Sequence, residues 1–267
     1  MNKSVKRATA WIMTVFLLLG GIFWVVSAQE EPRQTVTFAV EGSYPPFSWT
    51  EPNGRIMGFD VDIARALCRE MKVRCRIVAR EWPALIPDLL AHRYDAVIAA
   101  MSMTDVRRKQ VTFTDKYAQI PSRYVAHRDT VLTFTSAGLT GVKLGVIRDT
   151  SQDHYLTAQF GDVARIVRSD TIEGLHADLF TGRVAAVLAD AAVLDSAVLN
   201  TPGGGAYAFV GPVLRDPAWI GDGFGIALRP QDGPLQQRLN AAITAIRAKG
   251  IYQMLAEPYF SYDVYGY

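Results

Sequence analysis

Cysteine and histidine are scarce in this 267-residue sequence, which has two of the former and four of the latter. The histidines are scattered without the spacing of metal ligands, so no zinc site is expected. Basic residues form neither a stripe nor an arginine-rich run, which argues against nucleic acid as a partner. Because 49% of the residues are hydrophobic and only 20% are charged, the chain has the composition of a globular protein.

Short motifs of the common enzyme classes are also missing. There is no G-x-S-x-G elbow, no P-loop and no glycine-rich dinucleotide fingerprint. Asp60 and Asp62 lack the following glycine and the distal glutamate of a calcium loop, and capping of a helix by Asp60 explains them better. We therefore expect no cofactor, no metal and no catalytic residue.

The longest apolar run, Ala8–Val26, lies at the N-terminal end. Lys3 and Arg7 precede it, and Ser27 and Ala28 follow it. This pattern is typical of a secretory signal peptide cleaved after Ala28, whereas a retained membrane anchor is the alternative. Loss of 1–28 would leave 25 basic and 26 acidic residues, a formal charge of −1 instead of +2. We expect export to the periplasm.

The two cysteines, Cys68 and Cys75, lie close together in the sequence. An exported protein meets an oxidising compartment, so we expect a disulfide between them. Two buried thiols are the alternative.

Strands and helices alternate along the rest of the chain, which favours an α/β fold built from parallel β-α-β units. Strands are expected at Thr35–Val40, Val73–Ala79, Tyr94–Ala100, Lys143–Ile147, Ala164–Val167, Val184–Ala189 and Gly223–Leu228. Helices are expected at Asp60–Met71, Pro83–His92, from Thr104, from Thr150 or Ser151 to Phe160, and at Thr171–Phe180 and Pro234–Lys249.

The strand–helix pattern occurs in two runs, which indicates two lobes. Segments near Gln119–Ser122 and Gly211–Leu214 are candidate crossovers. We expect one lobe to contain 29–120 and 213–267, and the other to contain 121–212.

Ligands of open α/β sheets bind beyond the carboxyl ends of strands, so the loops there are candidate sites. Ser102 and Arg107 follow one expected strand, and a helix start with an arginine suits a carboxylate. Thr150 and Ser151 open the helix after another strand, and Asp190 follows a third. The alternatives are an exposed charge for Arg107, a turn for Ser102, and helix caps for Thr150 and Asp190.

A fourth loop joins an acid to aromatic residues. Glu41 and Tyr44 follow the first expected strand, and Trp82 lies in a later turn. A carboxylate between two aromatic faces would make a slot for a cationic side chain, although packing in the core is the alternative for Trp82.

Six segments carry a resemblance to a known family: Glu41–Phe47 (EGSYPPF), Gly58–Asp62 (GFDVD), Ala84–Pro87 (ALIP), Tyr94–Val97 (YDAV), Met101–Arg107 (MSMTDVR) and Tyr262–Gly266 (YDVYG). The sequence resembles type II periplasmic solute-binding proteins of polar amino-acid ABC transporters. The lysine/arginine/ornithine-, histidine- and opine-binding proteins are the most similar. The resemblance extends over about Thr35–Tyr265 and includes the cysteine pair.

The resemblance implies two lobes, each a mostly parallel sheet flanked by helices, joined by two crossover strands and closing on a ligand. It implies a membrane permease as partner, and we expect a monomer. It implies that Arg107 and the backbone N–H groups of Ser102 and Ser151 bind an α-carboxylate. Asp190 and the Ala100 carbonyl would bind the α-ammonium.

The side chain of the ligand would lie between Tyr44 and Trp82, with its distal cation at Glu41. Ala99 and Ala100 stand where the basic amino-acid binders have serines, and Glu41 stands where they have aspartate. Both features are similar to opine binders, whereas Asp190 matches the binders of free amino acids. We expect a free cationic amino acid: arginine, lysine, ornithine or histidine. An opine is the alternative ligand. A dehydratase-type enzyme and a sensor domain, both on this fold, are alternatives for the function.

Overall fold

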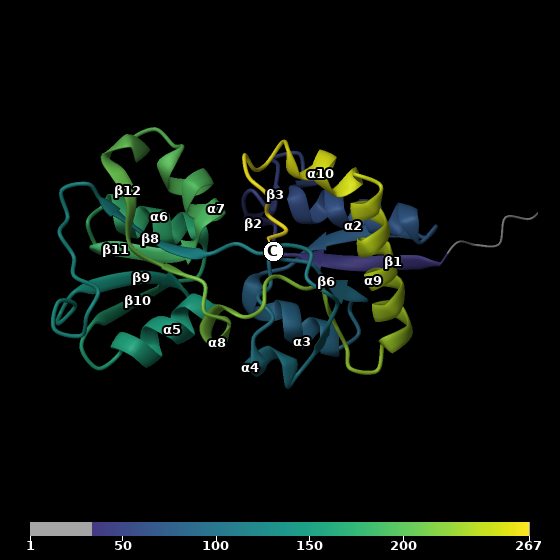
Figure 1. The fold of residues 1–267 in the computed structure, drawn as a ribbon, viewed down its shortest axis with the longest axis horizontal. Coiled ribbons are helices and arrows are strands. Elements are labelled where there is room, and N and C mark those ends of the chain that lie inside the picture. Colours follow the sequence, from purple (N-terminus) through teal and green to yellow (C-terminus); the bar gives the residue numbers. More distant parts are fainter. Residues whose placement is uncertain (1–33, 267) are drawn as a thin grey trace, which may run out of the picture. The chain divides into compact units, whose positions relative to one another are not determined.

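A computed structural model describes residues 34–266, which form two five-stranded sheets and one small three-stranded sheet (Figure 1). The first large sheet has the order β5-β1-β6-β13-β7 and the second the order β10-β9-β11-β8-β12. Strands of the first sheet are β1 (Thr35–Val40), β5 (Arg74–Ala79), β6 (Ala96–Val97), β7 (Thr112–Phe113) and β13 (Ala227–Leu228). Strands of the second are β8 (Ser122–His127), β9 (Lys143–Ile147), β10 (Arg165–Ser169), β11 (Ala186–Asp190) and β12 (Tyr207–Leu214).

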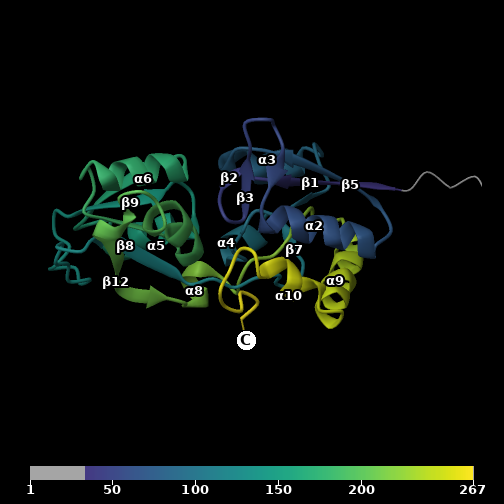
Figure 2. The same cartoon turned by 90° about the horizontal axis from the view of Figure 1, so that it is seen from above.

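Helices accompany each large sheet, and we call each sheet with its helices a lobe (Figure 2). The first lobe contains α2 (Phe59–Glu70), α3 (Leu85–Leu90), α4 (Asp105–Arg108), α9 (Gly233–Ala248) and α10 (Ile251–Ala256). The second contains α5 (Ser151–Phe160), α6 (Ile172–Phe180) and α7 (Ala191–Leu194), and α8 (Pro217–Ile220) packs on α5. The small sheet is formed by β2 (Ser43–Tyr44), β3 (Ser48–Thr50) and β4 (Ile56–Met57).

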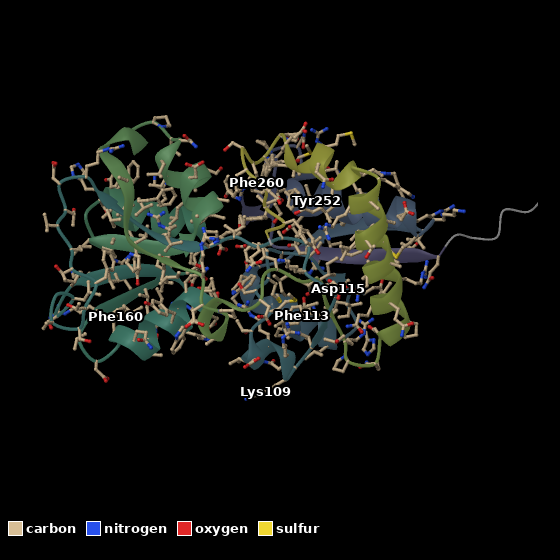
Figure 3. The ribbon with its side chains drawn as sticks, in the orientation of Figure 1. Lys109, Phe113, Asp115, Phe160, Tyr252 and Phe260 are labelled. Atoms are coloured by element: carbon tan, nitrogen blue, oxygen red, sulfur yellow. A yellow bond between two sulfur atoms is a disulfide. The ribbon has the colours of Figure 1, made fainter. Side chains whose placement is uncertain are left out.

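Alternation along the central strands explains why each sheet has helices on both faces. In β1, Phe38 and Val40 pack in the cluster that contains α2 and α9 residues, whereas Ala39 packs in the cluster that contains Leu85 of α3. Neighbouring strand residues point to opposite faces, so a strand apolar at consecutive positions needs cover on both sides. Figure 3 shows side chains filling both lobes, with Tyr252 in the first and Phe160 in the second.

The two-lobed α/β fold predicted from the sequence is confirmed, but each sheet is mixed instead of mostly parallel. In the first sheet β13 runs antiparallel to β6 and β7, and in the second β8 runs antiparallel to β11 and β12. Both β8 and β13 enter their sheet by a crossover from the other lobe, which reverses the local chain direction. The predicted lobe boundaries stay predictions.

The two crossovers lie side by side where β8 begins and β12 ends. Ser122 pairs with Leu214, and the register shifts between Val210 and Leu214. A C-terminal segment packs against the first crossover, since Gln119 N donates to Val264 O at 2.7 Å. The crossovers are therefore paired with each other and tied to the end of the described chain.

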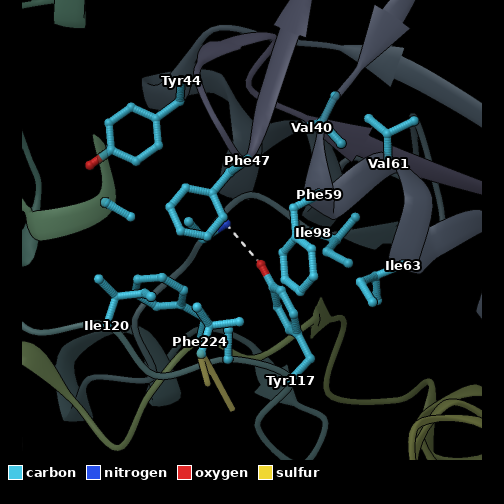
Figure 4. Packing of buried hydrophobic residues seen from close by; sticks show 14 of the residues in the cluster. Val40, Tyr44, Phe47, Phe59, Val61, Ile63, Ile98, Tyr117, Ile120 and Phe224 are labelled. Atoms are coloured by element: carbon cyan, nitrogen blue, oxygen red, sulfur yellow. Dashed lines mark hydrogen bonds between the residues drawn. The ribbon is translucent and has the colours of Figure 1, made fainter. Parts of the chain in front are cut away.

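The start of α2 corrects one prediction. The cap residue of the helix is Gly58, not Asp60, and Asp60 lies in the first turn. Gly58 has φ 124°, and a Cβ there would lie 2.3 Å from Phe47 O, so only glycine fits. Phe47 and Phe59 flank this tight contact and pack edge to face, and Figure 4 shows Phe59 beside Tyr117.

The predicted disulfide between Cys68 of α2 and Cys75 of β5 is confirmed. The predicted leader, 1–28, lies outside the described residues. Within 34–266, no helix has both the length and the apolar character needed to span a membrane.

Candidate functional site

Arg107 is held beneath the loop that follows β6. It lies in α4, whose cap Thr104 accepts a hydrogen bond from Arg107 N. The guanidinium group donates to Ser102 O at 3.0 Å and to Asp149 O at 3.4 Å, and lies 4.9 Å from the centre of the Trp82 ring. Burial lowers the pKa of Arg107 to about 10, so the group stays cationic at neutral pH. Arg107 is thus a buried cation with no ion pair among the described residues.

The second lobe brings the start of α5 to the same place. Thr150 caps this helix by accepting from Asp153 N at 3.2 Å, so the alternative of a helix cap is correct for it. Ser151 is buried, and its hydroxyl lies 3.4 Å from the hydroxyl of Ser102 in the first lobe. The loop before α4 and the start of α5 therefore approach each other across the lobes, and the N–H groups at the start of a helix favour an anion.

Asp190 is the last residue of β11 and precedes α7, but its side chain makes no capping hydrogen bond to that helix, which rules out a capping role for the carboxylate. Its carboxylate accepts from the Tyr44 hydroxyl at 2.9 Å and from Gln152 Nε2 at 2.8 Å. The net effect of the surroundings is to raise the pKa of Asp190 to about 7. Burial causes the rise, and these hydrogen-bond donors and the Arg107 charge partly oppose it. The carboxylate is thus oriented from both lobes.

Glu41 and Tyr44 line the site from the end of β1. The Glu41 side chain accepts from the Ser43 hydroxyl at 3.3 Å, and burial raises the pKa of Glu41 to about 7. Figure 4 shows the Tyr44 ring above Phe47, with its hydroxyl directed away from the core. Glu41, like Arg107, forms no ion pair among residues 34–266.

All nine residues predicted for ligand binding line one cavity of about 20 Å³. The predicted residues are Glu41, Tyr44, Trp82, Ala100, Ser102, Arg107, Thr150, Ser151 and Asp190. Sequence reasoning missed Ile147 and Gln152 in this lining. The sequence offers one signal for Gln152. It is the residue after Ser151 in the first turn of α5, so it lies at the same end of this helix as Ser151.

A larger cavity of about 590 Å³ lies along the crossovers and the C-terminal segment, and contains none of the nine predicted residues. We take the smaller cavity as the site because three buried charges converge there: Glu41 and Arg107 are 8% exposed and Asp190 is 5% exposed. Buried charges without partners are costly and usually serve a function. In the described part of the chain, no cluster of histidine, cysteine or acidic residues could hold a metal ion.

Comparison with known proteins shows relatives that match most of the chain. The chain is 43% identical over 232 residues to the L-arginine-binding protein of Pseudomonas aeruginosa, covering 86% of this chain and 90% of the relative. It is 33% identical over 253 residues to the lysine/arginine/ornithine-binding periplasmic protein of Escherichia coli, covering 93% of this chain and 96% of the relative.

A solved structure is similar as well. A Salmonella typhimurium periplasmic binding protein of high arginine specificity superposes with a TM-score of 0.78 at 30% identity, covering 85% of this chain and 100% of that one. Residues 36–262 match the model of one family over most of the chain. The chain therefore belongs to the bacterial extracellular solute-binding proteins, family 3.

Proposed function

We propose that this protein is the periplasmic receptor of an ABC uptake system and binds a free cationic amino acid, arginine before the others. The observation that carries the proposal is one buried arginine and two buried carboxylates around a single cavity. The names of the relatives support the ligand class, since they bind arginine, lysine and ornithine.

Charge matching gives the ligand its orientation. A free cationic amino acid carries one carboxylate, one α-ammonium group and one distal cation. Arg107 would pair with the carboxylate, Asp190 with the ammonium group and Glu41 with the distal cation. Every charge taken out of water then has a partner of opposite sign, which a buried ion needs. An acidic ligand would instead bring a second carboxylate to Glu41, which is unfavourable in a buried site.

Lobe closure follows from where these groups originate. Arg107 and Glu41 belong to the first lobe, whereas Asp190 and Ser151 belong to the second. A cavity of about 20 Å³ has room for little more than a water molecule, so entry of an amino acid requires the lobes to separate. Hinge closure around the ligand is the expected motion.

An opine is the second candidate, because Ala99 and Ala100 line the cavity without hydroxyl groups. The α-nitrogen of an opine carries a second carboxylate, however, and this group would lie against Asp190. We infer weaker binding for opines. We also infer that the protein binds its ligand without catalysis. Glu41 accepts one hydrogen bond, from the Ser43 hydroxyl, and its carboxylate is suited to an ion pair with the distal cation of the ligand.

Calorimetric titration of arginine, lysine, histidine, glutamate, glutamine and octopine into one preparation tests the proposal. Arginine should bind most tightly, and octopine should bind more weakly than the free cationic amino acids. Asp190→Asn should weaken arginine binding and narrow the gap to octopine. Asp195→Asn is the matched control, because Asp195 is exposed and outside the cavity. Tightest binding of glutamate or octopine would contradict the assignment.

A further inference from the structure

Two residues beside the cavity have an unusual backbone conformation. Positive φ angles occur at four non-glycine residues between 34 and 266: Lys72, His92, Ala100 and Asp149. Lys72 and His92 lie just past the ends of α2 and α3, where helices commonly finish in this way. Ala100 (φ 45°) and Asp149 (φ 58°) instead follow β6 and β9 and lead into the loops that line the cavity. The left-handed conformation is unfavourable for alanine and less so for aspartate, so at Ala100 above all it needs support from elsewhere.

In the first lobe the support comes from Asp60. Ala100 N donates to Asp60 Oδ2 at 2.9 Å, and the Tyr117 hydroxyl donates to Asp60 Oδ1 at 2.8 Å. Ala100 N also lies 3.0 Å from the Tyr117 hydroxyl, an interaction drawn as the dashed line in Figure 4. Asp60 is fully buried and forms no ion pair within 34–266. A buried carboxylate is costly, and here its hydrogen bonds are made to the Ala100 amide and to Tyr117.

In the second lobe Asp153 has the same role. Asp149 N donates to Asp153 Oδ2 at 3.1 Å. Arg168 Nε lies 2.9 Å from both oxygens of Asp153, which holds the carboxylate in place. The carbonyl of Asp149 in turn accepts from Arg107 and from Trp82, each at 3.4 Å. The turn held by Asp153 thus contacts the first lobe directly.

The consequence for binding is the direction of the backbone groups. In the described part of the chain, neither the Ala100 carbonyl oxygen nor the Ser102 N–H enters a hydrogen bond. We propose that Asp60 and Asp153 are positioning residues that hold the two loops in left-handed turns, so that these backbone groups face the ligand. The affinity measurements that test this inference rest on the proposed function, because they require arginine to bind. The statement that the two carboxylates hold the turns does not.

Asp60→Ala, studied in the otherwise intact protein, tests the first lobe. Arginine affinity should fall at least about tenfold, because the turn at Ala100 loses its support. Asp60→Asn, which keeps an acceptor oxygen, should stay within about threefold of the wild type. Ala100→Gly removes the steric cost of a positive φ, so Asp60→Ala with Ala100→Gly should bind at least about fivefold more tightly than Asp60→Ala alone. A role of Asp60 in general core stability would not produce this rescue.

Hydrogen exchange of the Ala100 amide gives a readout without ligand. In the free protein, Asp60→Ala should speed exchange at this amide at least about tenfold. If wild-type protein does not bind arginine, the proposed function fails, while the exchange result still decides the positioning role. Asp178→Ala is the control: Asp178 is also a buried aspartate, bonded to Ser169 and Arg183 away from the cavity, and should change stability without changing affinity.

If Asp60→Ala does not fold, variants of the second lobe still test the inference. Asp153→Ala should weaken arginine binding at least about fivefold, and Asp149→Gly should restore part of the loss. Folded variants of Asp60 or Asp153 that bind like the wild type and keep slow amide exchange would overturn the proposal. Glycine substitutions that give no rescue would do so as well.

Discussion

At the residue scale, Arg107 is the side chain with the largest expected effect on binding. Arg107→Ala should leave the fold intact and weaken arginine binding by about 2–4 kcal/mol, as expected when one partner of a buried charge pair is removed. Arg108→Ala is the matched control, because Arg108 is the next residue of α4, is exposed and pairs with Asp222 instead. Calorimetry on both variants measures the difference. Equal affinity of Arg107→Ala and the wild type would refute the role.

The acids of the cavity predict how affinity depends on pH. In the closed lobes, burial raises the pKa values of Glu41 and Asp190 to about 7, so each is partly protonated at neutral pH when no cation lies between the lobes. A cationic ligand pairs only with the ionised form. Arginine affinity should therefore rise between pH 6 and pH 8, by up to about tenfold for each carboxyl group. Calorimetry at both pH values should show a smaller rise in Glu41→Gln.

Stability of the free protein should change in the opposite direction. Unfolding returns Glu41 and Asp190 to ordinary pKa values of 4.5 and 3.8, so between about pH 4 and pH 7 the folded state holds protons that the unfolded state releases. Their contribution to the free energy of unfolding is full below the unfolded pKa values and is lost as the pH rises through about 7. Urea titrations at pH 5 and pH 8 should show a smaller loss in Glu41→Gln than in the wild type. An equal loss in both would contradict this origin.

Single residues also mark the limit of sequence reasoning. Thr104, Thr150 and Thr171 were expected at helix starts and do cap α4, α5 and α6, because a cap depends on three or four neighbouring residues. Asp60 and Asp190 were also considered as caps, but their carboxylates bind groups 40 and 146 residues away in the chain. Only the folded chain reveals such partners.

At the scale of elements, the disulfide joins α2 to the edge strand β5 of the first sheet. Replacing both cysteines by serine should lower the free energy of unfolding by about 2–3 kcal/mol, the effect expected for a small closed loop. Arginine affinity should not change, since neither cysteine lines the cavity. Denaturation with and without reductant tests this. Reductant should destabilise the wild type but leave the double variant unaffected, and a wild type insensitive to complete reduction would contradict the prediction.

Elements with strong local signals were predicted well, and those defined by pairing were not. β1 and β9 begin and end at the predicted residues, because each is a compact apolar run. The sequence gives no comparable signal for β12, whose Gly211 and Pro212 are typical of loops and whose pairing with β8 joins distant segments. The expected strand Tyr94–Ala100 is only β6, Ala96–Val97, because its end turns into the site at Ala100.

At the scale of the whole molecule, the site is complete only when the lobes meet. Saturating arginine should reduce the radius of gyration measured by small-angle X-ray scattering, because the ligand contacts groups from both lobes. Arg107→Ala at the same arginine concentration is the control and should scatter like the free protein. An unchanged profile at proven saturation would argue against closure as the binding mechanism.

A fluorescent label in the cavity of about 590 Å³ beside the paired crossovers would report the closure of the lobes. Tyr262 lines that cavity and is 49% exposed, and no free cysteine occurs within the described residues. A single cysteine introduced there could carry a fluorophore whose surroundings change as the crossovers bend. Emission would then report ligand concentration from a point outside the binding cavity, so the dye would not compete with the amino acid it detects.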